Sequence, residues 1–133
     1  MRVLVDTCIW SNVFRYKNPI LEDKHCLMKL VADDRALIIG PIRQEFLSGI
    51  KDIGKYHGLK DALRSFPDLP LKTELFELAA EMFNDCRRKG ISASAVDMMV
   101  CSASKYYGLE IWTEDPDFAH YKKCIDIHLY IRA

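Results

Sequence analysis

Acidic side chains that follow short apolar runs are the residues of this chain best placed to do chemistry. Asp6 follows the run at residues 3–5, and Asp115 comes soon after the run at residues 109–112. Short continuous apolar runs are typical of strands buried in a parallel sheet. Because ligands of open α/β sheets bind beyond the carboxyl ends of the strands, both aspartates are candidates for a site at that edge. Each one alone is weak evidence, since aspartate also caps helices and forms turns.

Asp97 is more informative, because it is the only charged residue between Gly90 and Lys105. Its neighbours predict a mostly buried helix, and an unpaired carboxylate in such a helix would be costly. A capping pair with Ser94 at the start of the helix is one explanation. That position would also direct Asp97 toward the strand ends, so a capping role and a ligand role do not exclude each other.

Glu45 lies on a predicted helix that Pro41 opens, beside the apolar face of Ile42, Phe46 and Gly49. A solvated glutamate favoured by the helix dipole explains it as well as a site role does. Four converging carboxylates would repel one another and raise each other's pKa values. A hard divalent cation such as Mg²⁺ relieves that repulsion, and such sites favour hydrolysis of phosphodiesters.

The elements that must position these acids alternate between strands and helices. Apolar runs predict strands at residues 2–6, 36–39 and 109–112, and the alternating segment 125–131 predicts a half-exposed edge strand. Apolar spacing predicts helices at residues 20–31, from 41 onward, at 55–65, 75–86 and 94–107. This order favours an α/β fold with helices on both faces of a mainly parallel sheet. We expect a single domain, residues 1–133.

Composition narrows the possible partners only a little. Nineteen basic residues balance nineteen acidic ones, so a nucleic-acid surface would depend on how the charge is distributed. The basic runs 87–89 and 122–123 are candidates, although the helix dipole is the favoured explanation for the first run. Five widely spaced cysteines without a CxxC pair predict free thiols. No apolar run is long enough for a membrane span, and we expect a cytoplasmic protein.

Four segments together resemble the PIN domain, most closely the VapC-type toxins of bacterial and archaeal toxin–antitoxin pairs. In chain order they are VLVDTCIWSNVF, PIRQEF, ISASAVDMMVCSASKYYGLEIWTEDPDF and the terminal hydrophobic strand. The resemblance covers essentially the whole chain and implies a three-layer α/β/α sandwich with a mainly parallel sheet. It implies a Mg²⁺-dependent endoribonuclease, with Mn²⁺ as a possible substitute, that acts as the toxin of a type II pair.

The resemblance also implies roles for individual residues. The acidic positions of the family's motifs match Asp6, Glu45, Asp97 and Asp115. Of these, the implied metal ligands are Asp6, Asp97 and Asp115. The resemblance implies supporting roles for four more residues. Thr7 and Thr113 match positions where a hydroxyl group supports the site, and Asn12 matches a polar position near the substrate groove. Asp117 matches an extra aspartate that the family often has.

The implied partners are an RNA substrate, a cognate antitoxin and a second copy of the chain, without a membrane. An antitoxin helix could lie against Leu27, Leu30, Val31, Phe46 and Ile50. Each of these residues suits the core better, and we expect core positions for them.

Other functions stay open from the residues alone. A haloacid-type phosphatase is disfavoured because Cys8 stands where a second aspartate is needed, and a receiver domain because Asp6 has no adjacent acid. The glycine-rich fingerprints of nucleotide-binding folds are missing from the sequence. The remaining alternatives are a non-catalytic PIN-like module that binds RNA or protein, and a housekeeping RNA-processing nuclease without an antitoxin.

Overall fold

Three short parallel strands form the centre of the computed structural model, which describes residues 1–15 and 18–132. The strands are β1 (Val3–Val5), β2 (Ala36–Leu37) and β3 (Glu110–Trp112). The helices are α1 (Thr7–Phe14), α2 (Leu21–Ala32), α3 (Gly40–Leu47), α4 (Ile53–Leu63), α5 (Thr73–Arg88), α6 (Ala95–Tyr107) and α7 (Asp117–Tyr121). The predicted α/β class is confirmed, and the first three predicted strands and the long helices are found with small shifts at their ends.

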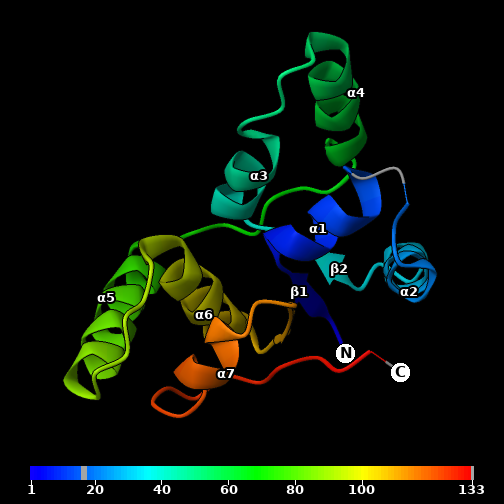
Figure 1. Ribbon diagram of the computed structural model, residues 1–133. Coiled ribbons are helices and arrows are strands. Elements are labelled where there is room, and N and C mark those ends of the chain that lie inside the picture. The colour runs from blue at the N-terminus through cyan, green and yellow to red at the C-terminus, as the bar shows by residue number, and fades with distance from the viewer. Residues whose placement is uncertain (16–17, 133) are drawn as a thin grey trace.

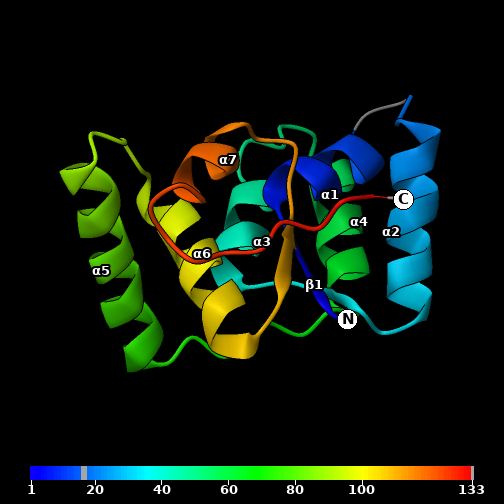
Figure 2. The same cartoon turned by 90° about the horizontal axis from the view of Figure 1, so that it is seen from below.

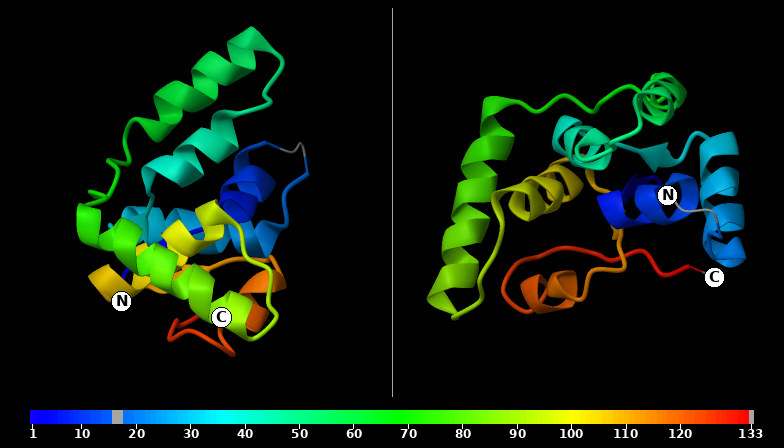
Figure 3. Two further views of the ribbon diagram at one scale, coloured as in Figure 1. Left: turned by 90° about the vertical axis from the view of Figure 1, so that its left-hand side faces the viewer. Right: turned by 45° about the horizontal axis from the view of Figure 1, so that its top comes forward.

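The strand order is β2–β1–β3, and both outer strands run parallel to β1. All three residues of β1 are buried, as expected for a central strand covered on both faces. Helices α5 and α6 lie on one side of the sheet and α2 on the other (Figures 1 and 2). Helices α3 and α4 lie toward one end of the molecule and α7 toward the other (Figures 1 and 3).

Helix α6 is the most deeply buried helix, because every residue from Met98 to Ser104 lies in the interior. The hydroxyl groups of Ser102 and Ser104 donate to backbone carbonyls of the same helix, so their burial leaves no unpaired donor. Gly108 ends the helix with a φ of 66°, a conformation that favours glycine. In the part of the chain that the structure describes, no helix combines the length and the apolar character needed to cross a bilayer.

Two predictions about the ends of elements were wrong. The segment 125–131 forms only an isolated bridge between Leu129 and Ile111, because β3 is too short to offer a longer ladder. Ile131, expected on the buried face, is 85% exposed. The helix opened by Pro41, expected to carry Gly49 on its apolar face, ends at Leu47, because Ser48 is already extended (ψ 137°) and Gly49 then adopts a left-handed φ of 82°.

Candidate functional site

The carboxyl ends of β1 and β3 carry the first part of the site. Val5 pairs with Trp112, so Asp6 and Thr113 leave the sheet side by side. The Thr113 hydroxyl donates to Oδ2 of Asp6 over 2.8 Å and accepts from the backbone N–H of Asp115 over 3.0 Å. One hydroxyl group therefore ties Asp6, which is 6% exposed, to the loop that carries Asp115.

The second part comes from the start of α6 and from the loop that enters α7. Ser94 caps α6 by accepting a hydrogen bond from the backbone N–H of Asp97 over 3.0 Å, as the sequence predicts. The backbone N–H of Asp117 donates to Oδ1 of Asp115 over 2.9 Å, which folds the two aspartates into one turn. Carboxylate oxygens of Asp97, Asp115 and Asp117 all lie within 4.8 Å of one another. We call these three residues the carboxylate group.

Burial and mutual repulsion both act on the acids of this region. Burial raises the pKa of Asp6, and the charges of Asp97 and Glu45 raise it further, while hydrogen bonds from Thr113 and the backbone oppose the shift. Burial likewise raises the pKa of Asp97, with the charges of Asp115 and Glu45 adding to the effect. Glu45, exposed on α3, thus lies close enough to act on both aspartates. The charges of the acids expected from the sequence thus act on one another in one region of the protein.

The remaining predicted residues differ in how closely they join this region. The Thr7 hydroxyl is buried without a hydrogen-bond partner among the described residues, and it does not cap α1. The Asn12 side chain is half-buried on α1 and makes no hydrogen bond to a described residue that would tie it to the acids. Asp117, expected to be secondary, joins Asp97 and Asp115 in the carboxylate group, whereas Asp6 lies beside that group.

Two residues of the site were missed in the sequence. The Tyr121 hydroxyl, on a side chain only 1% exposed, donates to Oδ2 of Asp97 over 2.6 Å. The Cys8 sulfur accepts from the backbone N–H of Glu114 over 3.3 Å and lies 3.5 Å from the Thr113 hydroxyl. No pattern in the sequence indicates the contact between Tyr121 and Asp97, because the two residues lie on different helices and α7 (Asp117–Tyr121) is short.

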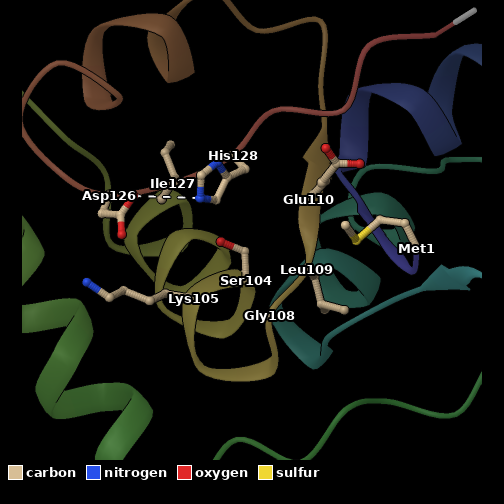
Figure 4. A pocket seen from close by; sticks show the side chains of 9 residues that line it. All are labelled: Met1, Ser104, Lys105, Gly108, Leu109, Glu110, Asp126, Ile127 and His128. Atoms are coloured by element: carbon tan, nitrogen blue, oxygen red, sulfur yellow. Dashed lines mark ion pairs between the residues drawn. The ribbon is translucent and has the colours of Figure 1, made fainter.

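A separate hollow of about 490 Å³ lies at the amino ends of the strands, beside Met1 and Glu110 (Figure 4). Its Asp126 and His128 side chains pair with each other over 3.7 Å and are both exposed. Glu110 lies across the hollow from Lys105 in Figure 4. These acids do not converge, so the chemistry suggested by the sequence belongs to the carboxyl edge of the sheet.

Comparisons with known proteins identify the family from the sequence and support the fold from solved structures. The sequence model of the PIN domain matches residues 3–123. Ribonuclease VapC11 of Mycobacterium tuberculosis is 27% identical over 120 residues, which cover 87% of this chain and 88% of that protein. The crystal structure of FitAcB from Neisseria gonorrhoeae superposes with a TM-score of 0.79 at 18% identity, covering 98% of this chain and 97% of that one. A toxin–antitoxin complex from Klebsiella pneumoniae gives a TM-score of 0.66 at 19% identity, covering 88% and 90%.

Proposed function

Because the chain belongs to the PIN domain family, we propose that it is a metal-dependent endoribonuclease that hydrolyses phosphodiester bonds of RNA. Its main support is the carboxylate group of Asp97, Asp115 and Asp117 at the carboxyl edge of the sheet. The relative that is 27% identical is named a ribonuclease, which supports RNA as the substrate. Such an enzyme would meet its substrate in the cytoplasm.

The donor set of this site suits a hard divalent cation. Mg²⁺ and Mn²⁺ prefer carboxylate and water oxygens. None of the three acids of the carboxylate group forms an ion pair with a described lysine or arginine, so their charge is not balanced by the protein. We propose Asp97 and Asp115 as ligands together with Asp6, and add Asp117 because of its place in the carboxylate group. A bound ion would act as a Lewis acid toward the phosphate and activate a water molecule.

The chain's own residues would hold these ligands in position. Tyr121 engages one oxygen of Asp97, and the backbone of Asp117 engages one oxygen of Asp115. The second oxygen of Asp115 accepts no hydrogen bond from a described side chain, which leaves it available as a ligand, and the Ser94 hydroxyl lies close to the Asp97 carboxylate and also helps to hold it. Thr113 fixes Asp6 against the same loop, and the charge of Glu45 would add to the attraction for a cation.

We further propose that the chain is the toxin of a toxin–antitoxin pair, with a cognate antitoxin and a second copy of itself as partners. The fold shared with a solved toxin–antitoxin complex supports this role. Helices α1 to α4 also surround an apolar groove of about 210 Å³, which suits an amphipathic helix of an antitoxin. Of the five residues suggested for this groove, Val31 and Phe46 line it, Leu27 and Leu30 lie in the core, and Ile50 is half-buried outside the groove.

RNA cleavage by the purified protein tests the enzymatic proposal. Structured RNA should be cleaved with Mg²⁺ or Mn²⁺ and left intact with EDTA. Asp97→Asn should abolish cleavage, whereas the matched change Asp61→Asn, at an exposed position of α4, should leave it unchanged. Cleavage that persists in Asp97→Asn or in EDTA would contradict the mechanism.

Expression in growing cells tests the toxin role separately. Growth should stop when the wild-type chain is made, continue when the Asp97→Asn chain is made, and resume when a protein encoded beside the gene is produced with the toxin. Normal growth with an active ribonuclease would indicate a housekeeping nuclease, and normal growth without RNA cleavage would indicate a binding module.

A further inference from the structure

We propose that the basic runs 87–89 and 122–123 form one surface that binds the phosphate backbone of RNA beside the carboxylate group. The basic surface is defined by five exposed side chains: Arg87, Arg88, Lys89, Lys122 and Lys123. This inference rests on the proposed ribonuclease function, because it assigns the surface to that enzyme's substrate.

A contact between two sulfur atoms brings the basic runs together. The sulfur of Cys86 lies 3.0 Å from that of Cys124. Cys86 directly precedes the first run, and Cys124 directly follows the second. The end of α5 accordingly lies beside the loop that follows α7 (Figures 1 and 2). Two runs that are far apart in the sequence therefore meet at one place on the surface.

This place adjoins the proposed catalytic site. A hollow of about 310 Å³ is lined by residues 90–92, which follow the first run, and by Asp117, His120 and Tyr121 of α7. Asp117 belongs to the carboxylate group, and Tyr121 donates its hydroxyl to Asp97. An extended polyanion that reaches the carboxylate group through this hollow would pass the basic surface.

Most of the charge of the basic surface is not balanced within the protein. Arg88 pairs with Asp85, but the other four cations form no ion pair with a described residue. The dipole of α5 accounts for cations in its last turn. Lys122 and Lys123 follow the end of α7 in the same way. The helix dipoles favour cations at each of these helix ends, but they do not balance two cationic runs placed side by side, because like charges in proximity repel.

The phosphates of a nucleic acid strand carry the negative charge that would balance the cations of the basic surface. Only the phosphate at the cleavage point can lie on the carboxylate group, so neighbouring phosphates need cations from the protein. Contacts of this kind position a strand without reading its sequence. The formal net charge of the chain is zero, so its overall charge does not attract RNA. The cations gathered on the basic surface would give this part of the protein a local attraction for RNA.

Binding of a fluorescein-labelled oligouridylate, followed by anisotropy in EDTA over a range of salt concentrations, tests the inference without cleavage. Two variants remove two charges each from the basic surface: Arg87→Ala with Lys89→Ala, and Lys122→Ala with Lys123→Ala. The matched control is Lys24→Ala with Lys29→Ala, exposed positions of α2 on the other side of the molecule (Figure 2). Each basic-surface variant should bind more weakly and reduce the salt slope by about 1.4, at about 0.7 for each phosphate contact. The control should bind as the wild type does.

The same variants separate this inference from the proposed function. Wild-type protein that cleaves RNA, with basic-surface variants that keep the wild-type salt slope, would overturn the inference and leave the function standing. Wild-type protein that binds RNA through the basic surface but never cleaves it would support the inference and refute the function. A control variant that lowers the slope equally would also overturn the inference, because binding would then follow overall charge. Circular dichroism should show that all variants keep the fold, since exposed substitutions of this kind have small effects.

Discussion

Replacing Thr113 with valine should loosen the connection between Asp6 and the loop of Asp115. The Thr113 hydroxyl donates over 2.8 Å to the Asp6 carboxylate and accepts over 3.0 Å from the Asp115 backbone. Valine keeps the branched shape of threonine, so this substitution removes both hydrogen bonds and little packing. A hydrogen bond to a charged group contributes about 1.5–3 kcal/mol and a neutral one about 0.5–1.5 kcal/mol. Because Thr113 is only half-buried, we expect a loss near the lower end, about 2 kcal/mol in total.

Urea unfolding of the metal-free protein measures this loss, and RNA cleavage measures its effect on the site. Groups that orient metal ligands typically change affinity or activity about 10–100-fold when removed, and we expect a decrease of that size in the cleavage rate. The matched control is Thr113→Ser, which keeps the hydroxyl and loses one methyl group, at a cost of about 0.8 kcal/mol. A valine variant with the stability and cleavage rate of the serine variant would refute the organising role of the hydroxyl.

Three further predictions concern Tyr121, Asp6 and the end of the chain. Tyr121→Phe removes the 2.6 Å hydrogen bond to Asp97 and should weaken Mn²⁺ binding about 10–100-fold in a calorimetric titration; wild-type affinity would contradict this. Burial raises the pKa of Asp6 above its ordinary 3.8. Ionising Asp6 therefore lowers the unfolding free energy of the metal-free protein, and this loss is absent below about pH 3.8 and grows as the pH rises through the raised pKa. The unfolding free energy of Asp6→Asn should therefore rise relative to that of the wild type as the pH increases from about 4 through the raised pKa of Asp6, and parallel pH profiles would count against a buried, repelled Asp6. Asp23, fully buried on α2, lies 2.7 Å from the Arg132 guanidinium without forming a well-aligned hydrogen bond. Arg132→Ala would leave this buried charge unpaired and should lower the unfolding free energy by about 3 kcal/mol, and Arg132→Lys should lower it by less. Equal stabilities of the wild type and Arg132→Ala would show that this ion pair does not stabilise the position of the C-terminal segment.

The positions of the acids on the fold were largely predictable from the sequence. Asp6 follows a buried run and Asp115 another, and the carboxyl ends of parallel strands meet at one edge. The apolar surroundings of Asp97 indicated that its charge needs a partner. Periodicity and burial report on such features because they depend on many neighbouring residues at once.

Contacts that depend on loop geometry were not predictable in the same way. Helix α7 has five residues, too few for a periodic pattern to show which face Tyr121 presents. Asp117 joins the carboxylate group through a turn in which its backbone bonds to Asp115. The alternating tail has the same pattern whether it forms a ladder or only lies beside β3, and the length of β3 decided between these outcomes.

Mn²⁺ binding by the wild type and three single variants tests the central claim, that carboxylates at the edge of the sheet hold a divalent ion. Paramagnetic resonance of free Mn²⁺ reports the bound fraction directly. The wild type should bind the ion, Asp97→Asn and Asp115→Asn should each bind it at least about tenfold more weakly, and Asp61→Asn should match the wild type. Equal Mn²⁺ binding by all four proteins, or none by the wild type, would contradict the account.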